Sequence, residues 1–331
     1  MRDVNPVGIE NMGNSCFLNA LVQCLCIPAA TDSIRENMVH STDPLDILVN
    51  FVATHPLDRQ IVGPETTRDF GQIVSYRRGL ARECALQIDT PLIREIFGTE
   101  IGLQGQQCPL QFFSAACKHD GIIASFFNAS VGEVLKCGEC GTALTTPHSW
   151  SDNYVQILKF DNDTVAVTLK NLILENIISS QIQDYRPAAH CNSRSSAEQC
   201  AARHGAYHVT YFSQRLPRHL CFALSSRTEE YSNNTRHFAP EHHMTLAEIA
   251  SYGDDASAIQ TPRMVQYDLY ATITHSGQGP HGGHFSAYVM HAHRLLFHFD
   301  DEHVQAVDAE TVINPPMHQA IYMLFYRRTT V

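Results

Sequence analysis

The chain has 331 residues, of which 44% are hydrophobic and 17% are charged. This balance is typical of a folded protein with a sizeable core and excludes an intrinsically disordered chain. The formal net charge of -11, from 34 acidic and 23 basic residues, argues against a nucleic-acid surface, because such a surface needs clustered lysine and arginine to neutralise phosphate. The length allows one large, subdivided domain or two small ones.

The cysteines indicate a reducing compartment. There are 11 of them, an odd number, and they do not form the evenly spaced framework of a disulfide-rich secreted domain. Residues 1–6 lack the apolar run of a signal peptide, and no stretch approaches the roughly 20 apolar residues of a membrane span. We therefore expect a monomer in the cytoplasm or nucleus, with no nucleic-acid or membrane partner.

The first predicted element is a buried helix over residues 14–28. Either Asn14 or Ser15 could cap its start, and apolar residues recur at helical spacing from Phe17 to Leu25. Pro28 is expected to end the helix. Its first turn then carries Cys16.

The pattern changes from helical to strand-like along the chain. Residues 30–120 are mostly helical in pattern, with an amphipathic helix near 111–117. Alternating apolar residues predict strands over 155–160 and 165–169, and the polar residues 225–243 predict a loop. Four further strands are expected near the end of the chain, at Tyr267–His275, His284–Met290, Leu295–Phe299 and Ala320–Tyr326.

A helical part followed by a strand-rich part predicts an α+β fold with a cleft between the two parts. We expect a single domain over residues 1–331. Residues 1 to about 125 would form its mainly helical part, and residues from about 126 to 331 its strand-rich part.

Cys16 is the candidate nucleophile. The free backbone N–H groups and the dipole at a helix start favour a negative group, which raises the thiolate fraction of a cysteine placed there. The alternative is a small buried hydrophobic residue, and position alone favours that alternative.

His284 is the candidate general base. Two glycines, Gly282 and Gly283, precede it at the mouth of the predicted strand 284–290 and would let backbone or substrate approach closely. The alternative is that it is simply one of 19 histidines, lying in a polar turn.

Asp300 is the candidate partner of His284. If residues 284–290 and 294–300 form a hairpin that turns at 291–293, residue 290 faces 294 and residue 284 faces 300. A carboxylate there would fix the imidazole tautomer. Asp301 would face away, although a register slip of one residue would exchange the two aspartates.

Asn11 lies just upstream of Cys16. Its amide could donate a hydrogen bond to the oxyanion of a tetrahedral intermediate, a contribution of about 10²–10³ in rate. The alternative is an asparagine that fills a turn beside Gly13, and spacing alone favours that alternative.

Together these segments resemble the ubiquitin-specific proteases. Residues 8–25, GIENMGNSCFLNALVQCL, resemble the family's cysteine box. Residues 282–289, GGHFSAYV, followed by 299–304, FDDEHV, resemble its histidine box. Three further segments, at 216–220, 267–271 and 320–326, resemble its connecting strands.

The resemblance implies a papain-like fold with a helical thumb and a β-rich palm and fingers. It implies hydrolysis of the isopeptide or peptide bond after the C-terminal glycine of ubiquitin, so the partners are ubiquitin or ubiquitinated proteins. It assigns Cys16 as nucleophile, His284 as base and then acid, Asp300 as the residue that orients His284, and Asn11 as oxyanion donor, with Asp301 as second choice for the acid. No cofactor is expected for catalysis, and the length leaves no room for accessory domains.

The sequence departs from the family where the modifier's tail is held. Residues 106–112 read QQCPLQF, so Cys108 replaces an aspartate and Gln111 a glutamate of the family motif. Charged hydrogen bonds to arginine are about twice as strong as neutral ones, so the grip on an arginine-rich tail is expected to be weaker. This leaves open a different ubiquitin-like modifier as the substrate. A non-catalytic ubiquitin-binding scaffold is a further alternative, against which the intact set of catalytic residues counts.

A structural zinc site is the last candidate. Cys137 and Cys140 form a CxxC half-site like the first half of the family's zinc knuckle. The second half would come from Cys191 and Cys200, which are more widely separated. The sequence leaves this zinc site and a set of free thiols equally open.

Overall fold

The protein is described by a computed structural model. It describes residues 8, 9, 11, 15–29, 40, 41, 46, 49, 108–117, 121–137, 150–160, 168–173, 180–182, 206–212, 216–226, 240–248, 263–279, 282–290, 295–312, 316 and 320–329.

The described helices comprise one long N-terminal helix and several short ones. The helices are α1 (Cys16–Ala29), α6 (Pro109–Ala116), α7 (Ile122–Phe127), α8 (Leu169–Ile173) and the 3-10 helix η4 (Ala309–Val312). The predicted helices at 14–28 and 111–117 therefore exist as α1 and α6. Pro28 does not end α1, which continues to Ala29, because a proline in the last turn removes only one hydrogen bond.

The strands form two sheets. The strands are β1 (Ala129–Cys137), β2 (Trp150–Asn153), β3 (Gln156–Phe160), β4 (Ser180–Ile182), β5 (Ala206–Phe212), β6 (His219–Ser226), β7 (His243–Glu248), β8 (Arg263–Gly279), β9 (Gly282–Met290), β10 (Leu296–Asp300), β11 (His303–Val307) and β12 (Ala320–Arg328). The larger sheet has the order β11-β10-β9-β8-β12-β6-β3, with β7 also paired to β8, and the smaller has the order β2-β1-β5-β4.

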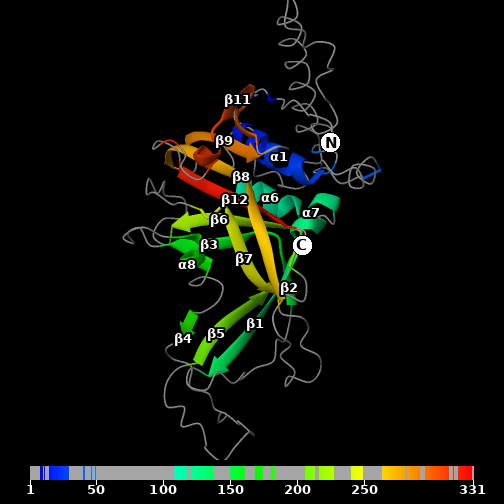
Figure 1. The fold of residues 1–331 in the computed structure, drawn as a ribbon, viewed down its shortest axis with the longest axis vertical. Coiled ribbons are helices and arrows are strands. Elements are labelled where there is room, and N and C mark those ends of the chain that lie inside the picture. The colour runs from blue at the N-terminus through cyan, green and yellow to red at the C-terminus, as the bar shows by residue number, and fades with distance from the viewer. Residues whose placement is uncertain are drawn as a thin grey trace, which may run out of the picture.

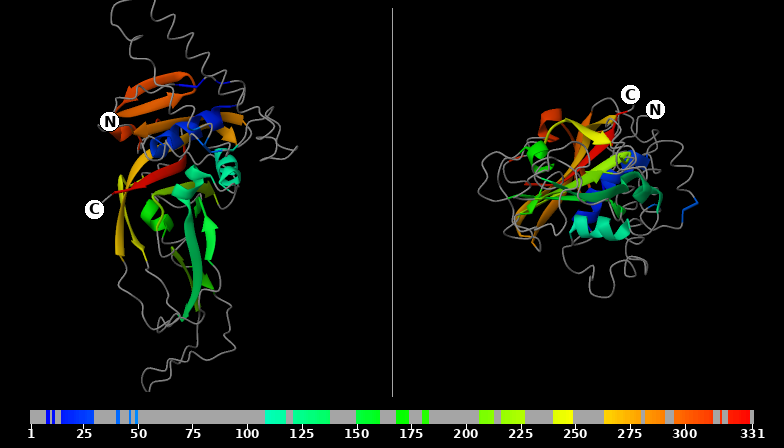
Figure 2. Two further views of the ribbon diagram at one scale, coloured as in Figure 1. Left: turned by 90° about the vertical axis from the view of Figure 1, so that its right-hand side faces the viewer. Right: turned by 90° about the horizontal axis from the view of Figure 1, so that it is seen from below.

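The two sheets occupy different ends of the molecule. Figure 1 shows α1, α6 and α7 beside the larger sheet, while β1, β2, β4 and β5 extend away from these helices. The turned view in Figure 2 shows the same separation. The candidate catalytic residues all belong to the end that holds the helices.

Helix α1 is buried because it is apolar on nearly every side. Its residues Phe17, Leu18, Leu21 and Leu25 are at most 3% exposed, which is the pattern of a core helix rather than a surface helix. The helix packs against β9, with α6 and α7 beside it. This packing holds the start of α1 close to the start of β9.

The larger sheet has an apolar core on each face. On one face, Phe285, Ala287 and Val289 of β9 pack in the cluster that contains α1. On the other face, Tyr288 packs in a second cluster that contains α8. Since side chains alternate along a strand, β9 contributes to both cores.

Two predicted elements differ from the structure. Of the predicted strand at 165–169, Val165 and Val167 lie outside the described residues, and Leu169 begins helix α8. Three of its residues, Leu169, Leu172 and Ile173, are buried at helical spacing, so the apolar residues serve a helix here. Residues 227–239 of the predicted loop at 225–243 lie outside the described residues, and only the ends of the prediction differ, since β6 extends to Ser226 and β7 begins at His243.

The hairpin of β9 and β10 has a different register from the predicted one. Met290 pairs with Leu296 and Ala287 with Phe299, so the strands are displaced by two residues from the arrangement in which 290 faces 294. The pairing starts later because residues 291–295 connect the strands, not 291–293 alone. A shift of two residues preserves the faces, and Asp300 therefore remains on the same face as His284.

Candidate active site

Cys16 is the first residue of α1. The carbonyl of Ser15 accepts hydrogen bonds from the backbone N–H groups of Leu18 and Asn19 at 3.0 and 2.9 Å, so Ser15 occupies the N-cap position. The thiol is therefore at the positive end of the helix dipole, as the sequence predicted. Cys16 is buried, which keeps bulk water away from the sulfur.

Gly283 brings His284 close to strand β8. Its φ of 154° lies in the region that favours glycine. A Cβ atom there would lie 2.4 Å from the imidazole of His275 and 2.5 Å from the carbonyl oxygen of Ser276. Only glycine therefore allows this approach of the strands immediately before His284.

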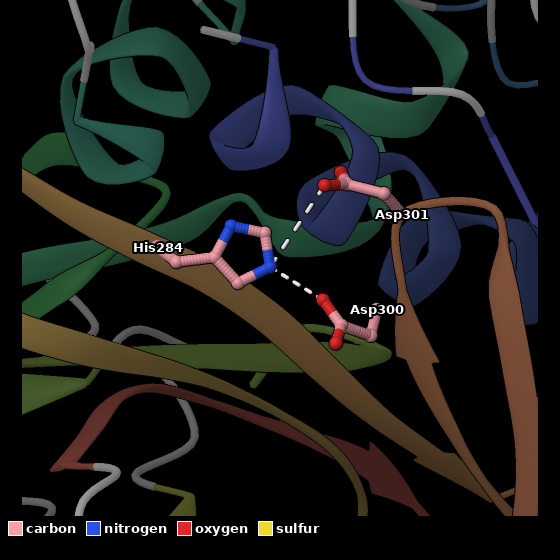
Figure 3. A group of neighbouring side chains, drawn as sticks. All are labelled: His284, Asp300 and Asp301. Carbon is pink, nitrogen blue, oxygen red and sulfur yellow. Dashed lines mark hydrogen bonds and ion pairs between the residues drawn. The ribbon is translucent and has the colours of Figure 1, made fainter.

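His284 joins the two halves of the candidate site. Its Nε2 atom is hydrogen-bonded to Oδ1 of Asp300, as Figure 3 shows. A hydrogen bond with Cys16 raises the pKa of His284 to about 9; the hydrogen bond with Asp300 and the charges of Cys16 and Asp301 act in the same direction, against a lowering by burial. Since Nε2 is engaged by Asp300, Nδ1 is the ring nitrogen that faces the thiol.

The hairpin argument predicted that Asp301 faces away from His284, and this prediction was wrong. Its Oδ2 lies 3.8 Å from Nε2 of His284 (Figure 3). The alternation of side chains fails here because β10 ends at Asp300 and Asp301 has a φ of 52°, in the left-handed region. The side chain of Asp301 is 9% exposed, against 48% for Asp300.

Two asparagines bind the carboxylate of Asp301. The amide nitrogen of Asn19 donates to Oδ1 at 2.8 Å, and that of Asn11 donates to Oδ2 at 3.0 Å. Burial raises the pKa of Asp301, and these two hydrogen bonds and the charge of His284 oppose that rise. The three side chains of His284, Asp300 and Asp301 each place a polar atom within 4.8 Å of the others.

Asn11 is held at both ends of its side chain. Its carbonyl oxygen accepts a hydrogen bond from the backbone N–H of Ser15 at 3.2 Å, while its nitrogen binds Asp301. The residue thus links Ser15, which directly precedes α1, to the carboxylate of Asp301. The predicted role toward an oxyanion remains a prediction.

The two residues that depart from the family's tail motif have different surroundings. Cys108 precedes α6 and is buried, with its sulfur 2.7 Å from the hydroxyl of Tyr322. Burial raises the pKa of its thiol. Tyr322 packs against Phe285, next to His284, with ring centroids 5.4 Å apart. Gln111, by contrast, is exposed on α6.

The candidate zinc ligands are only partly described. Cys137 is the last residue of β1 and pairs with Ala206 of β5 in the smaller sheet. Cys140, Cys191 and Cys200 lie outside the described residues. Four cysteine thiolates would suit tetrahedral zinc.

Asn19 was missed by the sequence reasoning. It is one of two polar residues, with Gln23, in the otherwise apolar run 16–25, and it is 3% exposed. An amide within an apolar run was the available signal, because a buried amide requires hydrogen-bond partners.

A thiol at a helix start that faces an imidazole held by a carboxylate is the arrangement of a cysteine-type hydrolase. The family model described as "Ubiquitin carboxyl-terminal hydrolase" matches residues 103–326, which is about two thirds of the chain. The chain belongs to this ubiquitin carboxyl-terminal hydrolase family. The resemblance noted in the sequence is therefore confirmed.

Known relatives share low identity over nearly the whole chain. Ubiquitin carboxyl-terminal hydrolase 26 of Arabidopsis thaliana is 23% identical over 90% of this chain and 26% of its own length. Ubiquitin carboxyl-terminal hydrolase 23 of the same plant is 20% identical over 97% of this chain and 35% of its own length. The chain thus spans about a quarter to a third of the length of these two relatives.

Solved structures show the same fold. The SAGA Ubp8/Sgf11/Sus1/Sgf73 DUB module bound to ubiquitin aldehyde matches with a TM-score of 0.63 and 19% identity, over 98% of this chain and 70% of that chain. A second structure of this SAGA DUB module, bound to monoubiquitin, matches with a TM-score of 0.62 and 19% identity, over 98% of this chain and 69% of that chain. The predicted α+β fold of a ubiquitin-specific protease catalytic domain is confirmed.

Two remaining findings concern metal and membrane. Members of this family often hold a structural zinc in the fingers. Among the helices that the structure describes, none is both long enough and apolar enough to cross a membrane.

Proposed function

We propose that the chain is a thiol-dependent deubiquitinase that hydrolyses the isopeptide or peptide bond after the C-terminal glycine of ubiquitin. The observation that carries the proposal is the contact of His284 with both Cys16 and Asp300. Membership of the hydrolase family supports it. So do the solved relatives of the same fold, which hold ubiquitin aldehyde or monoubiquitin.

The proposed reaction has two halves. The Cys16 thiolate attacks the carbonyl carbon of the terminal glycine, and the C–N bond breaks as His284 donates its proton to the departing lysine amine. A thioester remains on Cys16. His284 then accepts a proton from water, the hydroxide attacks the thioester, and the carboxylate leaves as the thiol is restored.

Asp300 and Asn11 support these steps without forming bonds to the substrate carbon. Asp300 holds Nε2 of His284, so that the ring keeps Nδ1 toward sulfur. Asn11 donates a hydrogen bond to the oxygen that becomes negative in each tetrahedral intermediate. Asp301 is the second choice for the acid, because it also lies near Nε2.

Kinetics with ubiquitin that carries a fluorogenic C-terminal amide test the proposal. Cys16→Ser and His284→Ala are each expected to lower kcat by at least about 10³-fold, since each removes a group that takes part in proton transfer or bond formation. His303→Ala is the matched control, because His303 is an exposed imidazole on the neighbouring strand β11, with 80% exposure. Near-normal turnover by His284→Ala would sink the assignment.

A second candidate is the same chemistry on a different ubiquitin-like modifier. Two observations favour it: Cys108 is buried against Tyr322, and Gln111 is neutral. Neither residue offers a carboxylate to an arginine of the modifier's tail. The same kinetics with matched fluorogenic modifiers decide between the two substrates by the ratio of their kcat/KM values.

We also propose a structural zinc held by Cys137, Cys140, Cys191 and Cys200 at the end of the smaller sheet. Metal analysis of the purified chain should then find about one zinc per chain, and Cys140→Ser should lower both zinc content and melting temperature. Cys26→Ser, a change of a cysteine on α1 that is not among the four proposed ligands, is the control and should leave zinc content unchanged. Zinc at background level in the wild-type chain would refute this site.

The proposed partners are ubiquitinated proteins. We propose that the chain acts on them as a monomer, in the cytoplasm or nucleus. Residues 1–331 would act as one catalytic domain. The net charge of -11 suits a partner with a basic surface.

A further inference from the structure

Asn19 is a buried polar residue in the first turn of helix α1, which carries Cys16. It lies three residues after Cys16 on α1 and is 3% exposed. Its amide nitrogen donates two hydrogen bonds, one to the carbonyl of Ile9 at 3.2 Å and one to Oδ1 of Asp301 at 2.8 Å. Both hydrogens of the amide are thereby directed at acceptors that lie outside α1.

The acceptor Asp301 connects three parts of the site. Its Oδ2 accepts from Asn11, and its backbone carbonyl accepts from the N–H of Ile9 at 2.9 Å. The same Oδ2 lies 3.8 Å from Nε2 of His284. The carboxylate of Asp301 therefore contacts Asn19 on the helix that carries Cys16, the side chain of Asn11, and the imidazole of His284.

The segment before α1 is pressed closely against this turn. A Cβ atom at Gly8 would lie 2.5 Å from the carbonyl oxygen of Glu302 and 2.7 Å from that of Asp301. These backbone atoms leave no space for a side chain at position 8. The left-handed φ of 52° at Asp301 is a second sign that packing around this turn fixes its conformation.

We propose that Asn19 is a positioning residue of the hydrolytic reaction, which holds the Asp301 carboxylate where it fixes Asn11 and His284 relative to Cys16. The reaction in this inference is that of the proposed function. The positioning by Asn19 is inferred only from the contacts described above. Asn19 itself does not touch the reacting atoms.

The hydrogen bond between Asn19 and Asp301 should depend on pH, because Asp301 is a buried carboxylate that can be protonated. Burial raises the pKa of Asp301, and the hydrogen bond from Asn19 is the largest of the effects that oppose this rise. The other charged groups that face the carboxylate are His284, which lowers its pKa, and Asp300, which raises it. Loss of Asn19 therefore raises the pKa of Asp301, and the carboxylate becomes protonated at a higher pH.

The experiment measures the alkylation rate of Cys16 by iodoacetamide, followed by peptide mass mapping, and kcat/KM, both from acidic to alkaline pH. In Asn19→Ala we expect about a tenfold loss of kcat/KM at neutral pH, because a buried carboxylate loses a donor. The acidic limb of both profiles should move to higher pH, because the pKa of Asp301 rises when the hydrogen bond from Asn19 is lost. Asn19→Asp, which keeps the volume of the side chain, should move it further, because two carboxyl groups then share one proton.

A double-mutant cycle separates positioning from simple helix stability. If Asn19 acts through Asp301, adding Asn19→Ala to Asp301→Asn should change kcat/KM by no more than about twofold and should not move the acidic limb. Gln23→Ala removes another buried amide from α1, one turn later, and its effect should add to that of Asp301→Asn.

Three outcomes would overturn the inference: additive effects of Asn19→Ala and Asp301→Asn, an unmoved acidic limb in both Asn19 variants, or the same coupling for Gln23→Ala. The alkylation rate needs no substrate. A wild-type chain whose Cys16 shows this pH behaviour but which cleaves no modifier would therefore contradict the proposed function while leaving the role of Asn19 toward His284 supported.

Discussion

Two neighbouring aspartates have different surroundings in the candidate site. Asp300 ends strand β10, is 48% exposed and binds His284 directly. Asp301 follows in a left-handed turn, is 9% exposed and is bound by Asn11 and Asn19. The exposed aspartate can orient the imidazole, while the buried one joins the imidazole to the elements around Cys16.

The pH dependence of kcat/KM tests the role of Asp300. Since the pKa of His284 is raised to about 9, the imidazolium persists in neutral solution and kcat/KM should fall as pH rises through about 9. Asp300→Asn removes one of the contributions that raise this pKa, so the alkaline limb should move to lower pH. A wild-type limb near the ordinary histidine value, or a limb that Asp300→Asn does not move, would contradict this role.

The same shift affects stability. The folded-state pKa of His284 lies above its ordinary value of 6.5. Its hydrogen bonds therefore stabilise the fold fully below about pH 6.5, and this contribution is lost as pH rises through about 9.

At the scale of elements, His219 joins strand β6 to helix α7. The centroid of its ring lies 5.5 Å from the ring centroid of Phe127, 6.1 Å from that of Phe126 and 5.5 Å from that of Tyr270. Within the described part of the chain, its Nδ1 has no hydrogen-bond partner. Burial, with smaller effects from Arg327 and Arg218, lowers the pKa of His219 to about 3.

Acid unfolding tests this buried imidazole. Below about pH 6.5 the unfolded chain binds a proton at His219 and the folded chain does not. The free energy of unfolding therefore decreases by up to about 1.4 kcal/mol for each unit by which the pH is lowered. His219→Phe keeps an aromatic ring among its neighbours and removes this proton. Its free energy of unfolding, measured in urea from about pH 7 to about pH 5, should fall less than that of the wild type. An equal fall would show that the folded chain also binds this proton, which would contradict the lowered pKa of His219. Exposed His303→Ala should behave like the wild type.

Elements whose pattern is local could be predicted from the sequence. The apolar repeat of Phe17 to Leu25 predicted α1, and alternation predicted β9 and β10. The prediction that His284 and Asp300 lie on the same sheet face is confirmed, although the predicted register was wrong by two residues. Side chains return to the same face every two residues along a strand. The position of Asp301 could not be predicted, since it depends on a backbone φ of 52° after the strand.

Other features depend on contacts between distant segments. The bond of Asn19 to Asp301 spans 282 positions, and no local pattern specifies such a partner. Leu169 lies in a helix because its neighbours Leu172 and Ile173 pack on the larger sheet. The zinc ligands stay a prediction, since only Cys137 of the four lies in the described part.

At the scale of the whole molecule, the candidate site is assembled from the two ends of the catalytic region. Helix α1 supplies Cys16 from the start of the chain, and β9 and β10 supply His284 and Asp300 from near its end. The larger sheet and the buried helix beside it hold these ends together. Catalysis should therefore require the intact fold and not a separable fragment.

The most direct measurement is the intact mass of the chain after incubation with ubiquitin that carries a C-terminal electrophile, beside matched probes built on other modifiers. We expect one ubiquitin adduct per chain, which Cys16→Ser abolishes and Cys26→Ser leaves in place. An adduct with another modifier alone would keep Cys16 as nucleophile and change the substrate. The absence of an adduct with every probe, from a chain that is folded by circular dichroism, would contradict the role of Cys16 as the nucleophile of a deubiquitinase.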